Sequence, residues 1–351
     1  MRLKKSFKNF TALFLAVIVF ALLLFDPKTA KTGVFSGLLL CGRVIIPSLF
    51  MFSFVVIFSN KSSVASNFVF LNKISLKLLG LDFYEFYIFL LSLIGGYPIG
   101  VKLLNEAVKE KNMDKNRAEE LSLFFISSGP GFTVSVIGET IFKSRQIGYI
   151  LFISQLLSAV VLCRLFIKKS NTNKIYNFKP YKLSDCFVKS VFEASQTLIN
   201  VSSFVIFFSF LTEYFIKYKN YLSLFKFMPY FLEITNAVNL TNNIYLISFL
   251  LGFSGISVIC QVISIADSFR INALKLFALR LVTGAVSCAF TKLLMRVFKV
   301  SVVTISTNKS FIRKEYFDSK AVAISLFVTL IVFMISIVSK KYAGKIKDDM
   351  V

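Results

Sequence analysis

Residues 84–104 read YEFYIFLLSLIGGYPIGVKLL, an apolar run that is interrupted near its centre by Gly95-Gly96-Tyr97-Pro98. Roughly 20 apolar residues suffice for a helix to cross a bilayer, but proline removes a backbone donor and glycine adds flexibility. Residues 121–141 carry a similar break at Ser127-Ser128-Gly129-Pro130-Gly131. Such breaks either kink packed helices or mark discontinuous helices whose ends form a substrate site near the bilayer midplane. Two dense breaks in one half of the chain favour discontinuous helices.

The composition places the chain in a membrane. Its 351 residues are 56% hydrophobic and include 42 phenylalanines, with a mean hydropathy of +0.73. A soluble protein of this length buries only about 75% of its surface, so it could not hide this much apolar area. No apolar segment alternates with polar residues as a barrel strand does, so the predicted fold class is an all-α polytopic membrane protein. Eight apolar segments are predicted as helices: 33–59, 84–104, 121–141, 146–167, 188–215, 243–265, 273–297 and 321–339.

Charge and missing residue types exclude several functions. The 41 Lys and Arg outnumber the 18 Asp and Glu, but they lie in short loops between apolar runs. This pattern follows the positive-inside rule and argues against nucleic acid as a partner. The sequence has 0 His, and its five cysteines show no CxxC spacing. Without imidazole bases, a catalytic triad or metal-ligand spacing, we predict no catalytic residue, no metal site and no cofactor, and the chain is not expected to be an enzyme.

The N-terminal apolar run, Phe10–Phe25, follows the basic stretch MRLKKSFK. A cleaved signal peptide is one interpretation, but no small-x-small cleavage site follows promptly. We therefore predict an uncleaved first transmembrane helix whose N-terminus lies in the cytoplasm. A second flanking helix is predicted at Ala321–Ser339, before a basic tail.

The loops at 60–77 and 168–182 are both basic, so both are expected on the cytoplasmic side. An even number of crossings must then separate them, although three apolar segments lie between. One of the two broken segments is therefore predicted to be re-entrant, and either can fill that role. With that count, residues 33–167 and 186–297 run in opposite directions, which is the arrangement of an inverted repeat.

Gly96-Tyr97-Pro98-Ile99-Gly100-Val101-Lys102 forms a GYPxGxK motif, and three further motifs follow it along the chain. They are FISSGPGF at 125–132, LEITN at 232–236 and GFSGISVICQ at 252–261. Together these motifs resemble those of the YlbJ-like sporulation integral membrane proteins, which belong to the nucleoside-recognition (Gate) domain family. The chain departs from the family pattern at Gly129, where many relatives carry Asn, and at Ala237, where they carry Gly. No polar contact or tight turn is therefore expected from these two positions.

The resemblance implies a bacterial inner-membrane protein of a spore-forming organism, and a transporter or permease of a small polar solute. Nucleosides are the solute class that the family name suggests, with a cation as the coupling ion. The alternative is a non-transporting membrane component of spore envelope or cortex assembly. The expected partners are the lipid bilayer, the solute, and either further copies of the chain or sporulation membrane proteins.

The same resemblance implies two gate-like units within the chain. The predicted organisation is an N-terminal transmembrane helix at 1–30, units at 31–168 and 186–298, a basic loop at 169–185, and a loop with the C-terminal helix at 299–351.

Charged residues within apolar runs are candidates for a site, because a charge at the bilayer centre costs a few kcal/mol unless it is paired or hydrated. Glu233, with Thr235 and Asn236, is suited to ion or polar-solute coordination, and a solvated interfacial loop is the alternative. Lys102 and Gln261 are predicted to face one cavity from opposite halves, unless Lys102 snorkels to the interface.

Arg280 lies among apolar residues and should require an internal carboxylate partner, for which Glu233, Glu139 and Glu193 are the candidates. The predicted substrate or ion pathway comprises Gly95, Gly96, Tyr97, Pro98, Gly100, Lys102, Ser127, Ser128, Gly129, Pro130, Glu233, Thr235, Asn236, Gly255, Ser257, Gln261 and Arg280.

Overall fold

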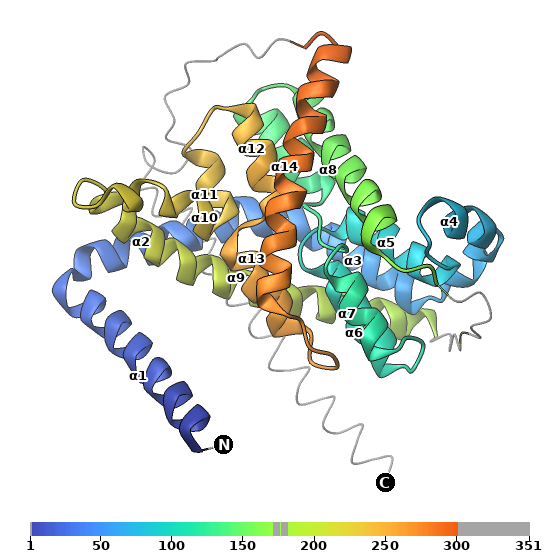
Figure 1. The fold of residues 1–351 in the computed structure, drawn as a ribbon, viewed down its shortest axis with the longest axis horizontal. Helices are drawn as coiled ribbons and strands as arrows, with labels where there is room; N and C mark the ends of the chain where they lie inside the picture. Colours follow the sequence, from blue (N-terminus) through green and yellow to red (C-terminus); the bar gives the residue numbers. More distant parts are fainter. Residues whose placement is uncertain (1, 171–175, 177–181, 301–351) are drawn as a thin grey trace.

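The computed structural model describes residues 2–170, 176 and 182–300, and every regular element in these residues is a helix (Figure 1). Five helical stretches are long and apolar enough to cross a membrane: Pro27–Lys61, Arg145–Phe166, Leu183–Lys217, Ile244–Ile265 and Ala273–Val297. The bent pair Val64–Leu78 and Phe83–Gly95 would make a sixth. The all-α membrane class is therefore confirmed. The predicted helix at 321–339 lies outside the described residues.

The same order of elements occurs twice along the chain. The first set is α1 (Arg2–Phe25), α2 (Pro27–Leu40), η1 (Cys41–Ile45), α3 (Ile46–Lys61), η2 (Val64–Leu71), α4 (Asn72–Leu78), α5 (Phe83–Gly95), α6 (Ile99–Lys109), α7 (Lys115–Ser122), η3 (Gly131–Ile141) and α8 (Arg145–Phe166). The second set is α9 (Leu183–Lys217), η4 (Ser223–Lys226), α10 (Met228–Leu232), α11 (Ile234–Asn239), α12 (Ile244–Phe253), α13 (Gly255–Ile265) and α14 (Ala273–Val297). After α1, each set has a long helix, a short connecting stretch, two interrupted helix pairs and a closing helix.

The two segments broken by Gly and Pro do not form continuous helices. Between α5 and α6, Gly96 has a φ of 73° and the Tyr97–Pro98 peptide bond is cis. Between α7 and η3, residues 125–129 are not helical, and η3 itself is a π-helix. The described residues contain seven of the eight apolar segments predicted from the sequence. Because of these breaks, five stretches among these residues qualify as membrane spans, or six with the bent pair.

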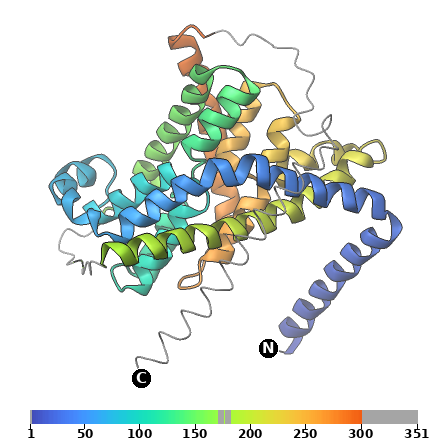
Figure 2. The same cartoon turned by 180° about the vertical axis from the view of Figure 1, so that it is seen from behind.

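Two long helices of 35 residues each run side by side, as Figure 2 shows: the continuous stretch Pro27–Lys61, which comprises α2, η1 and α3, and α9. We call them the arm helices. At one end, Lys217 of α9 forms an ion pair with Asp26, which caps α2. At the other end, Cys186 Sγ of α9 donates to the Lys61 carbonyl, 3.5 Å away. The arm helices are therefore antiparallel, with their ends matched.

Small residues bring the backbones of the arm helices into contact. A Cβ atom on Gly33 would lie 2.7 Å from Phe210 Cα, and one on Gly37 would lie 2.7 Å from Ile206 Cα. Gly33 and Gly37 are four residues apart on one face of α2, the spacing of the GxxxG motif that allows close helix packing in membranes. The sequence analysis did not single out this motif.

α8, α12 and α14 run steeply across the arm helices in Figure 1. A Cβ atom on Gly252 of α12 would lie 2.6 Å from Gly284 Cα of α14, so these backbones touch. Beside this contact, Ser248 Oγ lies 3.0 Å from Ser287 Oγ and 2.7 Å from Thr291 Oγ1. Such small and hydroxylated residues are typical of helix interfaces in membranes, where apolar side chains gain nothing by leaving lipid.

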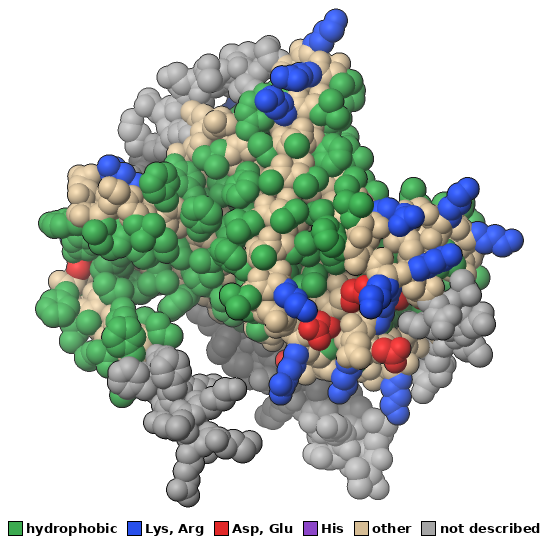
Figure 3. Space-filling view, in the orientation of Figure 1, with side chains coloured by type: hydrophobic (Ala, Val, Ile, Leu, Met, Phe, Trp, Pro, Cys, Tyr) green, Lys and Arg blue, Asp and Glu red, His purple; other side chains and the backbone are tan. Residues whose placement is uncertain are grey.

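The surface seen in Figure 3 has a broad apolar face across the middle of the molecule. Lys and Arg side chains gather beyond it, at the upper end of α14 and at the lower right of the view. Large apolar side chains of α14 are exposed, for example Leu274 at 81% and Leu293 at 54%. An apolar belt between charged ends is the surface that a lipid bilayer requires.

Candidate functional site

The two breaks in the first half of the chain lie directly against each other. A Cβ atom on Gly96 would lie 2.9 Å from the Gly129 nitrogen, and one on Gly100 would lie 2.1 Å from the Phe125 carbonyl oxygen. Only glycine permits backbones to approach this closely, and Gly96 also has the positive φ that glycine tolerates. The turn between α5 and α6 therefore sits on the non-helical residues 125–129.

The second half repeats this contact between breaks. Ser254 and Gly255, between α12 and α13, have φ values of 71° and 82°. A Cβ atom on Gly255 would lie 3.3 Å from the Leu232 carbonyl oxygen and 3.4 Å from the Ile234 nitrogen. The break at 254–255 therefore packs on the break at Glu233, between α10 and α11. Tyr97 Oη joins the two halves by donating to the Leu251 carbonyl at 2.8 Å.

A cavity of about 30 Å³ lies where these breaks meet. Such a volume holds a water molecule or a bare ion when polar partners are present. Its lining comes from both halves and both arm helices: Ile45, Ser48, Leu49, Tyr97, Ser128, Gly129, Phe132, Val201, Val205, Glu233, Ile234, Thr235, Val258 and Gln261. The predicted residues Tyr97, Ser128, Gly129, Glu233, Thr235 and Gln261 are thus brought together, although they are up to 164 positions apart in the sequence.

Glu233 is the charged residue of this lining, and its side chain is almost completely buried, with 1% of the residue exposed. Its carboxylate caps α11 by accepting the Asn236 N–H at 2.7 Å and the Thr235 hydroxyl at 3.0 Å. No Lys or Arg among the described residues forms an ion pair with it. The alternative of a solvated interfacial loop is therefore wrong.

Gln261 reaches the same cavity from α13. The residue is 2% exposed, and its Nε2 donates to Ser257 Oγ one turn earlier, at 3.2 Å. Gln261 therefore brings a side-chain amide to the same cavity lining as the carboxylate of Glu233. Together with the hydroxyl groups of Tyr97 and Ser128, these groups can coordinate a cation or accept hydrogen bonds from a polar solute.

The prediction that Lys102 and Gln261 share a cavity is wrong. Lys102 Nζ lies 3.3 Å from Glu193 Oε2 of α9 and donates to the Glu193 carbonyl at 3.0 Å and to Thr197 Oγ1 at 3.2 Å. Lys61 also pairs with Glu193, at 2.8 Å. Three oxygen atoms of the arm helix α9 surround the Lys102 ammonium. They stabilise its charge better than a small cavity or the membrane interface would.

A second carboxylate, Glu106, lies close to this ion-pair cluster at the end of α6. Asn60 Nδ2 donates to Glu106 Oε2 at 3.2 Å. Burial raises the pKa of Glu106 to about 7, and the negative charge of Glu193 acts in the same direction, while Lys102 and Lys61 oppose it. Two carboxyl groups therefore share two lysines where α3, α6 and α9 meet.

Arg280 is 2% exposed, and none of its three predicted carboxylate partners forms an ion pair with it. Glu139 pairs with Arg145, Glu193 pairs with the two lysines, and Glu233 caps α11. Arg280 Nη1 instead donates to the Ile126 carbonyl at 2.9 Å, in the non-helical stretch of the first half. The predicted carboxylate partner of Arg280 is therefore wrong. The Ile126 carbonyl lies in a non-helical stretch and is the acceptor instead, and the sequence does not reveal this.

Of the other predicted pathway residues, some lie at the helix breaks and others contact a different part of the protein. A Cβ atom on Gly95 would meet the Ile99 side chain at 2.8 Å, Pro98 precedes α6, and Pro130 precedes η3. Asn236 Nδ2 donates to Ser209 Oγ of α9 at 2.8 Å, so it ties α11 to an arm helix. Ser127 lines a second cavity with Arg280.

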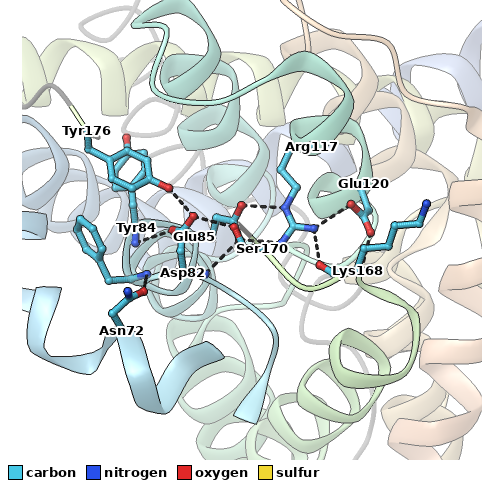
Figure 4. A network of polar contacts seen from close by, with 10 residues as sticks. Asn72, Asp82, Tyr84, Glu85, Arg117, Glu120, Lys168, Ser170 and Tyr176 are labelled. Atoms are coloured by element: carbon cyan, nitrogen blue, oxygen red, sulfur yellow. Dashed lines mark hydrogen bonds and ion pairs between the residues drawn. The ribbon is translucent and has the colours of Figure 1, made fainter. Parts of the chain in front are cut away.

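Polar residues that the sequence analysis missed form a network that ties the start of α5 to the end of α8 (Figure 4). Asp82 caps α5 and accepts the Ser170 hydroxyl at 2.9 Å. Glu85, one turn into α5, pairs with Arg117 of α7 at 2.7 Å, and Arg117 Nη1 donates to the Lys168 carbonyl at 2.7 Å. The signal in the sequence was the Asp-x-x-Glu capping box, which predicts the start of a helix but not these partners.

The network also shows how the α5/α6 pair is arranged. Arg117 lies at the start of α7, eight positions after α6 ends at Lys109, yet it bonds to the first turn of α5. Both ends of the α5/α6 pair therefore lie at the same end of the molecule, and the pair is a hairpin whose tip is Gly96-Tyr97-Pro98.

A further polar residue that the sequence analysis missed, Gln155 of α8, holds the non-helical stretch by accepting the Ser128 hydroxyl at 2.6 Å. The candidate site is thus identified from the positions and contacts of these residues. The chain matches no protein-family model, no curated protein and no solved structure, so its resemblance to the Gate family stays a prediction.

Proposed function

We propose that this chain is a membrane transporter or permease that carries a small polar solute through the cavity between its two halves. One observation carries the proposal: helix breaks from both halves line one cavity, and the buried residues Glu233 and Gln261 belong to the same lining. The resemblance to the Gate family makes nucleosides the first solute class to test.

Discontinuous helices expose backbone N–H and C=O groups inside a membrane, which is tolerated only where protein or a cavity covers them. In transporters such groups bind substrates and coupling ions near the bilayer midplane. Glu233 has no cationic partner among the described residues, so its carboxylate can accept a coupling cation or the hydroxyl and amino groups of a solute.

The topology agrees with an inverted repeat of two gate-like units. The hairpin α5/α6 begins and ends at one end of the molecule, which supports segment 84–104, not 121–141, as the re-entrant one. The Ser170 N–H donates to the Gly80 carbonyl at 2.7 Å, so the basic loops that flank these segments lie on the same side. That side is cytoplasmic by the positive-inside rule, and the units 31–168 and 186–298 then cross in opposite senses.

The first experiment measures the melting temperature of the detergent-purified full chain against nucleosides, nucleobases, organic anions and monovalent cations. A ligand at about 100 times its Kd stabilises the folded state by about 2.7 kcal/mol, which should raise the melting temperature by several degrees. We expect one class to give a saturable shift that is lost in Glu233→Gln and in Gln261→Ala.

Two exposed positions supply matched controls: Asp114→Asn for the carboxylate and Gln196→Ala for the amide. Both controls should keep the full ligand shift. The ligand class found in this way is then tested for uptake into liposomes that contain the purified chain. A wild-type protein that melts cooperatively and shifts with none of these classes would contradict the proposal and favour the spore-assembly alternative.

A further inference from the structure

A second, smaller cavity of about 10 Å³ lies next to the candidate site. Its polar lining is Ser127, Gln155, Arg280 and Thr283, and its remaining lining is apolar apart from Gly252. Arg280 and Gln155 are 2% and 4% exposed, so both lie inside the protein. The volume corresponds to roughly one water-sized particle.

Two buried nitrogen donors of the residues that line this cavity have no hydrogen-bond acceptor. Arg280 Nη1 is bonded to the Ile126 carbonyl, but Arg280 Nε has no hydrogen-bond partner. Gln155 Oε1 faces the Ser128 N–H at 3.3 Å, and because an N–H can only donate, the oxygen of the amide must be on that side. Gln155 Nε2 is then directed elsewhere and also lacks a partner. Buried donors without acceptors are rare and call for an explanation.

The cavity also lacks a negative charge. The guanidinium of Arg280 stays protonated in proteins, and no carboxylate among the described residues forms an ion pair with it. The hydroxyl of Thr283 is committed to the Leu279 carbonyl at 2.8 Å. Buried charges are normally paired, because removing an unpaired charge from water is costly.

We infer that this cavity binds a single halide-sized inorganic anion, held by Arg280 Nε and Gln155 Nε2. A water molecule would accept both hydrogen bonds but would leave the charge of Arg280 uncompensated. The cavity is too small for a phosphate or an organic acid, which limits the occupant to a monatomic anion such as chloride. This anion site stands independently of the transported solute.

The test compares the melting temperature of the purified full chain in sodium chloride and in sodium gluconate at equal ionic strength, without any solute. Gluconate is too large for the cavity. We expect chloride to raise the melting temperature saturably, by several degrees, in the wild type. Arg280→Gln should remove the chloride effect, whereas Arg296→Gln, at an exposed position on the same helix, should keep it.

A second variant decides the question if Arg280→Gln does not fold. Gln155→Glu replaces Nε2 with an oxygen, which places a carboxylate beside Arg280 and still accepts from Ser128. It should melt above the wild type in gluconate and should no longer respond to chloride. A cooperatively melting wild type without any chloride effect would overturn the inference in favour of a bound water. An unchanged chloride effect in Gln155→Glu would overturn it as well.

Discussion

Replacing Gly100 with alanine should force α6 away from the non-helical residues 125–129. The new Cβ would lie 2.1 Å from the Phe125 carbonyl oxygen and 2.6 Å from Ser92 Cβ, whereas ordinary van der Waals contact begins at 3.4 Å. Because the closest neighbour is backbone, a change of side-chain rotamer cannot relieve the clash. Overpacking of this kind costs about 1–3 kcal/mol, and the higher helix propensity of alanine returns at most about 1 kcal/mol.

Because the clash at 2.1 Å is with backbone, its cost lies at the upper end of this range, and the expected net loss is about 2 kcal/mol, which is read as a lower melting temperature of the purified protein. The displaced hairpin tip also carries Tyr97 away from the cavity, so the ligand shift of the variant should weaken together with its stability. The control is Lys109→Ala, on the exposed side of the same helix, which should change stability by less than about 0.5 kcal/mol. A Gly100→Ala protein that melts at or above the wild-type temperature would refute the close approach of α6 to Phe125.

Two further predictions concern the polar clusters. Because burial raises the pKa of Glu106 to about 7 from its ordinary 4.5, the folded state holds this proton more tightly than the unfolded state. The resulting stabilisation is complete below about pH 4.5 and is lost as the pH rises through about 7, so the melting temperature should fall over this range and Glu106→Gln should flatten the slope. In the network at the start of α5, Arg117→Ala removes the guanidinium that pairs with the fully buried Glu85 and should cost about 3–5 kcal/mol. The double variant Arg117→Ala/Glu85→Gln should recover part of this loss in thermal melts, and a double variant less stable than the single one would contradict the pairing.

The broken helices were predictable because glycine and proline act locally. Gly96, Pro98 and Pro130 lie in two dense clusters of helix-breaking residues, and these clusters indicate the positions of the breaks. Burial of Glu233 was one of two interpretations that the sequence left open, because a carboxylate beside an apolar run lies either among polar partners or in water. The sequence therefore indicated six of the fourteen residues that line the candidate cavity, including its charged residue.

The partners of the charged residues were not predictable, because they depend on packing between distant segments. Lys102 faces an arm helix instead of the cavity, and Glu193 on that arm lies 91 positions further along the chain. Arg280 bonds to a carbonyl that is free only because the helix before it is broken. Every residue has such a carbonyl, so no feature of the sequence distinguishes this one.

The length of the arm helices links the candidate cavity to the thickness of the bilayer. At 1.5 Å per residue, 35 residues extend about 52 Å, whereas the hydrocarbon core is about 30 Å thick. The charged ends, with Asp26 and Lys217 on one side and Lys61 and Glu193 on the other, must both reach water. The arms must therefore either tilt or extend beyond the core at their ends. A thinner bilayer would increase this excess length, and because Ser48 and Val201 of the arms form part of the cavity wall, a change in arm tilt would change the shape of the cavity.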